Sequence, residues 1–326
     1  MPSYEVEIAI AAVIKAAQLC EAVRADLAGV AAIEKDDRSP VTIADFGSQA
    51  VVCHMLKTAL PDVPIVGEED SADLRRPENA PEWAHVTAYV QRFYPDATPE
   101  MLCEWIDAGN GEVADRFWTL DPIDGTKGFL RDDQYAIALA LIEDGEVTVG
   151  VLGCPALPVD LDDLERGKGV IFVAVRGKGT QMARLDALDF TPVHVAHAAD
   201  AAAWRFVESV ESAHGDHALQ EAIAQAAGIT RPPLRMDSQV KYGAVARGDA
   251  VLYLRLPSPK HPGYREKIWD HAAGTLVVEE AGGRVTDMHG RPLDLASAAR
   301  MNHTQGVVVS NGVLHAAVLD ALTSKE

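Results

Sequence analysis

The chain has 326 residues, 48% of them hydrophobic, which supports either two domains or one large layered domain with a sizeable core. Its 29 basic and 49 acidic residues give a formal charge of −20, which argues against binding to a nucleic-acid backbone or an anionic membrane. A small anionic ligand is still compatible with this charge if metal ions or a few cations reverse the field locally. The four cysteines show no paired spacing, so we expect reduced thiols and a cytoplasmic protein.

The N-terminal stretch predicts an amphipathic core helix, because apolar residues recur at steps of three and four between Val6 and Leu27. Charged residues interrupt this stretch, so it has neither the basic start nor the unbroken apolar run of a targeting or membrane segment. Pro40 disfavours helix just before it, and a second helix is expected from about Asp45. Capping of that helix is a purely structural role open to the Asp45 carboxylate.

The run Pro64–Gly67 predicts a short strand that leads into three acids, Glu68, Glu69 and Asp70. The alternative is that these acids are ordinary surface residues without a functional role. The following stretch, Ser71–Gly111, contains four prolines and helical pieces. We interpret it as an insertion over or beside a functional site, such as a lid.

The stretch Phe117–Thr126 predicts a buried strand that ends in a turn, because apolar and aromatic residues lead into Pro122 and Gly125. Asp121 and Asp124 then lie at the strand end and on the turn. Carboxylates this close repel each other and raise at least one pKa unless a cation lies between them, and Mg²⁺ is the usual solution. A turn with solvated aspartates is the alternative, but a second acidic strand end in the chain favours a convergent acidic site.

Two hairpin patterns then predict an antiparallel sheet, with Tyr135–Ile142 paired to Val147–Leu152 and Val170–Val175 paired to Thr180–Ala183. The second half alternates helices and strands instead, which is a layered α/β pattern. The expected elements are a helix over 218–227, a strand over 250–256, a helix from about 270, a strand over 306–310 and a helix over 313–322. We place the domain boundary between residues 193 and 194.

The segment Ile268–Gly283 predicts a closely packed helix in the second half. Asp270 is expected to be its N-cap, and Gly282 is expected to end it. The small residues 272–274 allow this helix to approach a neighbouring backbone, which could bring Asp270 into a shared site.

Three motifs, Val66-Gly67-Glu68-Glu69, Asp121-Pro122-Ile123-Asp124-Gly125-Thr126 and Trp269-Asp270-His271-Ala272-Ala273-Gly274, occur in this order. The ordered set resembles the Mg²⁺-dependent, lithium-sensitive phosphatase superfamily of inositol monophosphatase. Residues 39–45, 125–131, 236–242 and 252–257 are similar to its branch of 3′(2′),5′-bisphosphate nucleotidases in particular. The resemblance implies an α/β (α+β) fold, a layered αβαβα sandwich in which an antiparallel sheet domain precedes a smaller α/β domain.

The resemblance also implies a reaction, hydrolysis of the 3′-phosphate of 3′-phosphoadenosine 5′-phosphate by metal-activated water. Glu68, Asp121 and the carbonyl of Ile123 would hold one Mg²⁺. Asp121, Asp124 and Asp270 would hold a second, and a third ion near Glu68 is compatible with the pattern. No covalent phosphoenzyme is needed, because two metals can stabilise both the attacking and the leaving oxygen.

Further roles follow from the same resemblance. Asp45 and Thr126 would orient and deprotonate the attacking water. The residues implied in substrate binding are Gly125, Thr126, His214, Ser238, Lys241 and Arg255. Of these, Ser238, Lys241 and Arg255 would contact the 5′-phosphate or the purine, and His214 the adenine side. The alternatives are a surface His214, a solvated Lys241 and an Arg255 that ends an edge strand. The chain departs from the family pattern at Asp132–Asp133, where Gly-Asp is usual.

Two other functions are compatible with the sequence. An enzyme of the same superfamily could act on inositol phosphates or fructose bisphosphate, but the stretch Met236–Tyr242 argues against it. A non-catalytic metal- or nucleotide-binding protein could use the same fold, but none of the acids in the pattern is missing.

Overall fold

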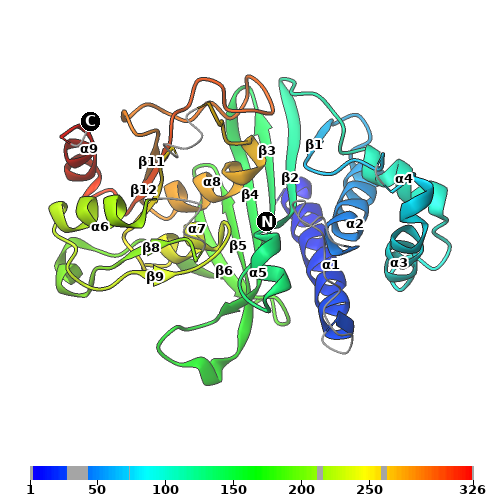
Figure 1. Cartoon of the computed structure of the whole chain (residues 1–326), viewed down its shortest axis with the longest axis horizontal. Helices are drawn as coiled ribbons and strands as arrows, with labels where there is room; N and C mark the ends of the chain where they lie inside the picture. The colour runs from blue at the N-terminus through cyan, green and yellow to red at the C-terminus, as the bar shows by residue number, and fades with distance from the viewer. Residues whose placement is uncertain (1–2, 28–42, 73, 211–215, 258–262, 325–326) are drawn as a thin grey trace.

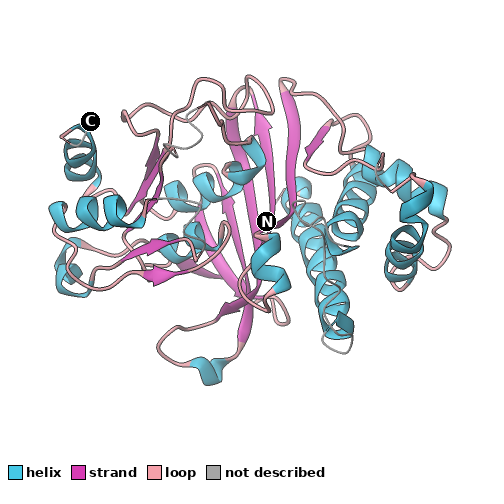
Figure 2. Ribbon diagram, viewed as in Figure 1, coloured by secondary structure: helices cyan, strands magenta, loops and turns pink. Residues whose placement is uncertain are grey.

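The computed structural model describes residues 3–27, 43–72, 74–210, 216–257 and 263–324. Its elements form five layers, in which helices, a sheet, helices, a second sheet and helices follow one another across the molecule (Figures 1 and 2). The predicted αβαβα sandwich is therefore confirmed. In these residues no helix combines the length and the apolar character needed to cross a membrane.

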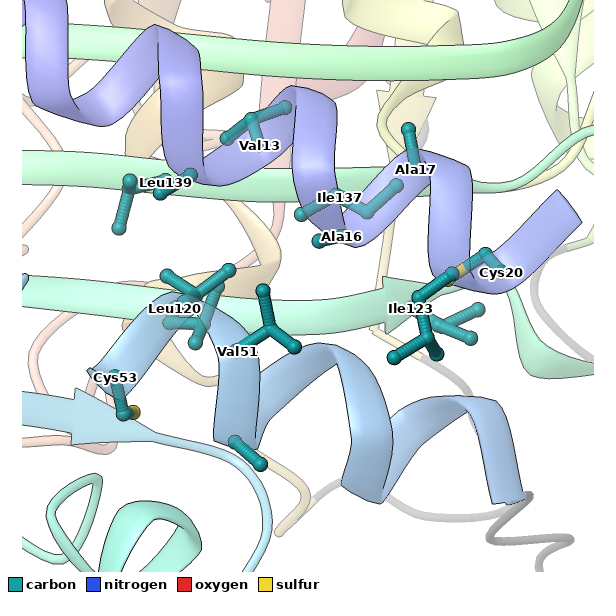
Figure 3. Packing of buried hydrophobic residues seen from close by; sticks show 14 of the residues in the cluster. Val13, Ala16, Ala17, Cys20, Val51, Cys53, Leu120, Ile123, Ile137 and Leu139 are labelled. Atoms are coloured by element: carbon teal, nitrogen blue, oxygen red, sulfur yellow. The ribbon is translucent and has the colours of Figure 1, made fainter. Parts of the chain in front are cut away.

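The first layer contains α1 (Tyr4–Leu27) and α2 (Ile43–Ala59), which pack together on one face of the first sheet. Figure 3 shows Val13 and Ala16 of α1 and Val51 of α2 against sheet residues such as Leu120 and Leu139. The insertion forms α3 (Ala80–Gln91) and α4 (Pro99–Asp107), which pack against α2 on the outer side of this layer (Figure 1). The insertion therefore lies on the side of the first layer that faces away from the second sheet.

The first sheet has the strands in chain order, and each pairs with the next along the sheet. They are β1 (Ile65–Gly67), β2 (Arg116–Asp124), β3 (Ala136–Glu143), β4 (Glu146–Pro158), β5 (Lys168–Val175), β6 (Gly179–Arg184) and β7 (Thr191–Val193). Both predicted hairpins are confirmed as antiparallel pairs, while β1 runs parallel to β2. A parallel pair needs a long connection, and the insertion supplies it.

The prediction of a turn at Pro122 is wrong. Strand β2 continues through Pro122 to Asp124, and its register with β3 shifts between Asp121 and Asp124. Proline lacks an N–H and is tolerated in a sheet at such an irregularity. The turn comes at Gly125, whose φ of +90° favours glycine, and the short helix α5 (Thr126–Leu130) follows.

The second sheet is mixed, with the strand order β11-β12-β10-β8-β9. Its strands are β8 (Phe206–Glu208), β9 (Leu234–Arg235), β10 (Leu252–Arg255), β11 (Arg284–Thr286) and β12 (Val307–Ser310). Helices α7 (Val240–Ala246) and α8 (Ala272–Glu280) lie between the two sheets, and α6 (His217–Ala226) and α9 (His315–Thr323) cover the outer face (Figure 1).

Alternation along β3 shows how the layers are joined. Ile137, Leu139 and Leu141 belong to the core cluster with α1 and α2, whereas Ala136, Ala138 and Ala140 belong to the cluster with α7 and α8. The small alanines leave room for α8, and Gly150 of β4 would place a Cβ only 2.9 Å from the carbonyl of Ala273. Helices of the second half thus share one core with the first sheet. The predicted boundary at 193/194 follows the last strand of that sheet and stays a prediction.

The predicted N-cap role of Asp270 is wrong. Asp270 ends a short 3₁₀ turn (Ile268–Asp270), and His271 takes the N-cap position of α8. Oδ2 of Asp270 accepts a hydrogen bond of 3.1 Å from the backbone N–H of Lys267, so the carboxylate closes the preceding turn instead. The helix does end before Gly282, which has a φ of +93°.

Candidate active site

Carboxylates from four segments converge at the carboxyl ends of β1 and β2. These strands run side by side, with Gly67 opposite Leu120, so the ends that carry Glu68 and Asp121 meet at one edge of the sheet. Asp45 projects from the first turn of α2, and Asp270 comes from the turn before α8. The charges of Glu68, Asp124, Asp270 and Asp45 all act on Asp121, which is only 2% exposed. The predicted acidic residues therefore form one cluster.

The acid cluster has an excess of negative charge. Burial and the neighbouring carboxylates hold the pKa of Asp121 well above its usual range. Burial, together with the charges of Asp124, Glu266 and Glu68, raises the pKa of Asp270 to about 7. Desolvation by the surrounding protein and the charge of Asp45 raise the pKa of Glu68 to about 7. Part of this residue nevertheless stays open to solvent. Clustered hard oxygen donors with excess negative charge fit divalent cations such as Mg²⁺.

The end of β2 is held in shape by its own hydrogen bonds. Oδ1 of Asp121 accepts from the N–H of Ile123 at 3.1 Å, and Oγ of Ser48 donates to the carbonyl of Pro122 at 2.9 Å. The hydroxyl of Thr126 donates to the carbonyl of Ile123 at 3.3 Å. These three hydrogen bonds fix the backbone of residues 121–126 at the end of the strand.

Gln239, which the sequence reasoning did not select, joins the two halves of the site. Its backbone N–H donates to Oδ2 of Asp124 at 2.6 Å. Its side-chain Nε2 donates to the carbonyl of Trp269 at 2.8 Å, and its Oε1 accepts from the N–H of Gly274 at 3.1 Å. Gln239 is 1% exposed, so these are buried contacts between the end of β2 and the segment that carries Asp270.

A cavity of about 240 Å³ opens beside the acid cluster, between the two halves of the chain. Its lining includes most of the predicted substrate residues, namely Gly125, Thr126, Ser238, Lys241 and Arg255, together with the acids Asp124 and Asp270. Sequence reasoning missed the lining residues Ser209, Asp237, Tyr242, Tyr253, Tyr264, Glu266 and His271. The predicted His214 lies outside the described residues, and no described residue of the insertion lines the cavity.

Comparison with known proteins assigns the chain to a family. A model described as the inositol monophosphatase family matches residues 2–325. The chain belongs to this family. A protein of Schizosaccharomyces pombe named 3′(2′),5′-bisphosphate nucleotidase is 45% identical over 99% of this chain and 96% of the relative. One of Oryza sativa with the same name is 42% identical over 98% of this chain and 94% of the relative.

Solved structures agree on the fold. An IMPase of Thermotoga maritima has a TM-score of 0.63 at 21% identity and covers 99% of this chain and 98% of its own. An inositol monophosphatase from Anabaena has a TM-score of 0.59 at 20% identity, with 98% and 95% covered. At these identities the likeness concerns the fold alone. The predicted membership in the superfamily, and the closer similarity to nucleotidases, are confirmed.

In this family member Lys241 is not a solvated helix residue. It is 4% exposed, its Nζ donates to the carbonyl of Met236 at 3.4 Å, and it lies 5.1 Å from the ring centre of Tyr253. Burial lowers the pKa of Lys241 to about 8, against the opposing effect of Asp124 and Asp237. A buried lysine that lines a cavity is suited to binding an anion.

Arg255, by contrast, already has a carboxylate partner. Its Nε donates to Oε1 of Glu266 at 2.9 Å. Burial opposes the charge of Glu266, but His271 and Arg255 outweigh it and lower the pKa of Glu266 to about 2. Glu266 is therefore ionised, and it neutralises much of the charge that Arg255 presents to the cavity.

Two residues of the cavity wall have constrained backbones. Ser238 has a φ of +63°, which is uncommon for a residue with a side chain. A Cβ on Gly125 would lie 2.9 Å from Cβ of Ser238, so glycine is needed at this position both for its φ and for the close approach. Ser238 and Gly125 therefore lie against each other across the junction of the two halves.

Proposed function

We propose that this chain is a Mg²⁺-dependent phosphatase that removes the 3′-phosphate of 3′-phosphoadenosine 5′-phosphate to give AMP and phosphate. The 5′-phosphosulfate analogue is a further candidate substrate. Two observations together support the proposal. Over nearly its full length the chain is 42–45% identical to proteins named 3′(2′),5′-bisphosphate nucleotidase, and a buried lysine lines the cavity beside the acid cluster.

Two to three Mg²⁺ ions are proposed for the acid cluster. Glu68, Asp121 and the carbonyl of Ile123 would hold the first, and Asp121, Asp124 and Asp270 the second, with a third near Glu68. When bound, such ions neutralise a phosphate monoester and stabilise both the attacking and the leaving oxygen. The raised pKa values of Asp121 and Asp270 support this assignment, because burial and the neighbouring carboxylates both oppose ionisation of these two groups.

Asp45 and Thr126 are assigned to the attacking water. Thr126 would orient the water, and Asp45 would accept its proton. The Thr126 hydroxyl gives its hydrogen to the carbonyl of Ile123, so its oxygen can accept a hydrogen bond from water. Asp45, a carboxylate that is 2% exposed, would accept the proton from that water as general base.

Recognition of the second phosphate is assigned to other polar residues that line the cavity. Lys241 supplies the charge, Ser238 a hydroxyl, and Arg255 a guanidinium whose position Glu266 fixes. A nucleoside with two phosphates thus has separate sets of contacts for its two anionic groups. A substrate with one phosphate would use the acid cluster alone.

A substrate panel with purified protein and Mg²⁺ tests the proposal. The panel contains 3′-phosphoadenosine 5′-phosphate, its 5′-phosphosulfate analogue, inositol 1-phosphate, inositol 1,4-bisphosphate and fructose 1,6-bisphosphate. We expect the largest kcat/KM for 3′-phosphoadenosine 5′-phosphate. A larger value for any inositol or fructose phosphate would overturn the proposal.

We further propose a cytoplasmic setting for the enzyme. All four cysteines, Cys20, Cys53, Cys103 and Cys154, are buried and unpaired. Free buried thiols of this kind are usual in reducing compartments.

A further inference from the structure

His271 carries a buried ring nitrogen that lacks a hydrogen-bond partner among the described residues. The residue is 2% exposed, and its Nδ1 pairs with the hydroxyl of Tyr242 at 2.7 Å. Its Nε2 makes no hydrogen bond within the described part of the chain, and the nearest carboxylate oxygen that it faces, Oε2 of Glu266, is 3.8 Å away. Because buried polar atoms are nearly always satisfied, this nitrogen can accept a further partner such as a bound ion.

Two carboxylates surround that nitrogen. Glu266, Asp270 and His271 each offer one ligand atom, and these three atoms lie within 4.8 Å of one another. The two oxygens of Glu266 have different neighbours, since Oε1 accepts from Arg255 at 2.9 Å and Oε2 faces His271. A cation at this position would therefore use the oxygen that Arg255 does not occupy.

This donor set differs in kind from the proposed Mg²⁺ ligands. The Mg²⁺ ligands are all oxygens, which hard cations prefer. One imidazole with two carboxylates suits Zn²⁺ and other late first-row ions, which bind nitrogen more strongly. We propose that Glu266, Asp270 and His271 form a Zn²⁺ site that shares Asp270 with the Mg²⁺ ligands.

The hydroxyl of Tyr242 orients the histidine for this role. A histidine that ligates a metal usually gives its other ring hydrogen to a fixed acceptor, and Tyr242 stands at that position. The ring of Tyr242 cannot shift easily, because it packs against Gly274 so closely that a Cβ there would overlap it. The Nε2 atom is thereby held toward the two carboxylates.

Binding of Zn²⁺ at this site inhibits the enzyme, because Asp270 cannot serve both ions fully. The ion also draws on Glu266, which holds Arg255 in the cavity wall. The inhibitory consequence rests on the proposed function, whereas the binding itself does not. Binding and inhibition therefore need separate measurements.

Binding is tested on the metal-free native protein with Co²⁺, whose visible absorption reports nitrogen ligands and low coordination numbers. We expect an absorption band that Zn²⁺ abolishes at far lower concentration than Mg²⁺. We also expect Asp45→Asn to keep this band and His271→Asn to lose it. A native protein that gives only the weak spectrum of an all-oxygen site contradicts the proposal, whatever the folding of the variants.

Inhibition is tested as the Zn²⁺ inhibition constant of each variant, relative to its own zinc-free activity. Tyr242→Phe removes only the orienting hydroxyl and should raise the constant by about 10–100-fold. His271→Asn should raise it at least as much. The exposed His194, changed to Asn, serves as the matched control and should leave the constant as in the wild type. Equal constants in all four proteins would overturn the site. If no substrate is turned over, the proposed phosphatase function is wrong. The Co²⁺ spectrum still shows whether the Zn²⁺ site exists.

Discussion

The backbone N–H of Gln239 donates a hydrogen bond of 2.6 Å to Oδ2 of Asp124, and this contact joins the start of α7 to the end of β2. The same residue binds the carbonyl of Trp269 and the N–H of Gly274 through its side chain. Asp124 and Asp270 come from opposite halves of the chain, and Gln239 lies between them. Its three hydrogen bonds therefore set the relative position of two proposed ligands of one ion.

Replacing Gln239 by Ala removes two of these three hydrogen bonds. The carbonyl of Trp269 and the N–H of Gly274 are then left buried without a partner, at a cost of about 1–3 kcal/mol each. We expect the free energy of unfolding to fall by about 2–4 kcal/mol, and kcat to fall because the second ion loses its geometry. Denaturant unfolding and initial rates measure the two effects.

Gln225 provides the matched control for this variant. It lies exposed on α6, and its Nε2 donates to Oε1 of Glu221. Gln225→Ala should change the stability by less than about 0.5 kcal/mol. Equal stability of the two variants would show that the side chain of Gln239 does not hold the halves together.

The acid cluster could be predicted from sequence because it is built from charge. Asp121, Asp124 and Glu68 stand at the ends of apolar strands, where a carboxylate has no structural reason to gather with others. Gln239 has no charge, and its contribution to joining the two halves depends on which backbone groups lie opposite it. Such contacts exist only after the two halves have packed, so the local pattern carries no signal for them.

Two further points have the same origin. Lys241 was open to interpretation as a solvated residue, because burial of a lysine depends on the second sheet and on Tyr253. The turn predicted at Pro122 is displaced to Gly125, because a shift in the strand register absorbs the proline. The layered fold itself was predicted correctly. Strand and helix periodicities indicated a layered α/β pattern, and the αβαβα sandwich followed from the resemblance that the ordered motifs carry.

Lys241 should distinguish substrates with two phosphates from those with one. A charge-assisted contact contributes about 1.5–3 kcal/mol. Lys241→Ala should therefore lower kcat/KM for 3′-phosphoadenosine 5′-phosphate by roughly 10–150-fold, and change it little for 3′-AMP. Steady-state kinetics on both substrates provide the measurement. Lys178→Ala, an exposed lysine in the β5–β6 turn, is the control for general loss of charge.

An equal loss on both substrates would remove the discriminating role of Lys241. The inositol phosphate alternative would then gain support, because its substrates need no separate contact for a 5′-phosphate.

His315 should make the second sheet sensitive to acid. Its Nε2 and Nδ1 pair with Thr286 at 2.9 Å and Ser310 at 2.8 Å. Thr286 gives its hydrogen to the carbonyl of Asp287, so its oxygen accepts from Nε2–H, and Nδ1 accepts from Ser310. Burial, aided by the charge of Arg284, lowers the pKa of His315 from 6.5 to about 4. The native state thus holds the neutral ring.

The sign of the pH effect follows from this lowered pKa. Between pH 6.5 and pH 4 the unfolded chain binds the proton and the native state does not, so stability is full above 6.5 and falls with acidification. We expect a loss of about 1–3 kcal/mol across this window relative to His315→Asn. Urea unfolding of both proteins from pH 4 to pH 8 gives the difference. His289→Asn, at an exposed position, should parallel the wild type; parallel curves for His315→Asn would refute the prediction.

Asp45 and Asp121 should respond differently to neutralisation. Asp121→Asn removes a ligand proposed for both ions, so turnover and Mg²⁺ affinity should be lost together. Asp45→Asn removes the proposed base, so Mg²⁺ should still bind while hydrolysis slows by about 10²–10⁴-fold. Calorimetric titration with Mg²⁺ and rate measurements separate the two. An equal loss of Mg²⁺ affinity in both variants would identify Asp45 as a ligand.

Removal of the metal should reverse the stability order of wild type and Asp121→Asn. A carboxylate whose pKa is raised in the native state destabilises that state whenever the pH keeps it ionised, and burial and four neighbouring acids raise the pKa of Asp121. With chelator at pH 8, Asp121→Asn should therefore unfold at a higher temperature than the wild type. With saturating Mg²⁺ the wild type gains the binding free energy and should become the more stable protein. A variant that is less stable under both conditions would show that the Asp121 charge is balanced within the protein, and that the cluster does not need a cation.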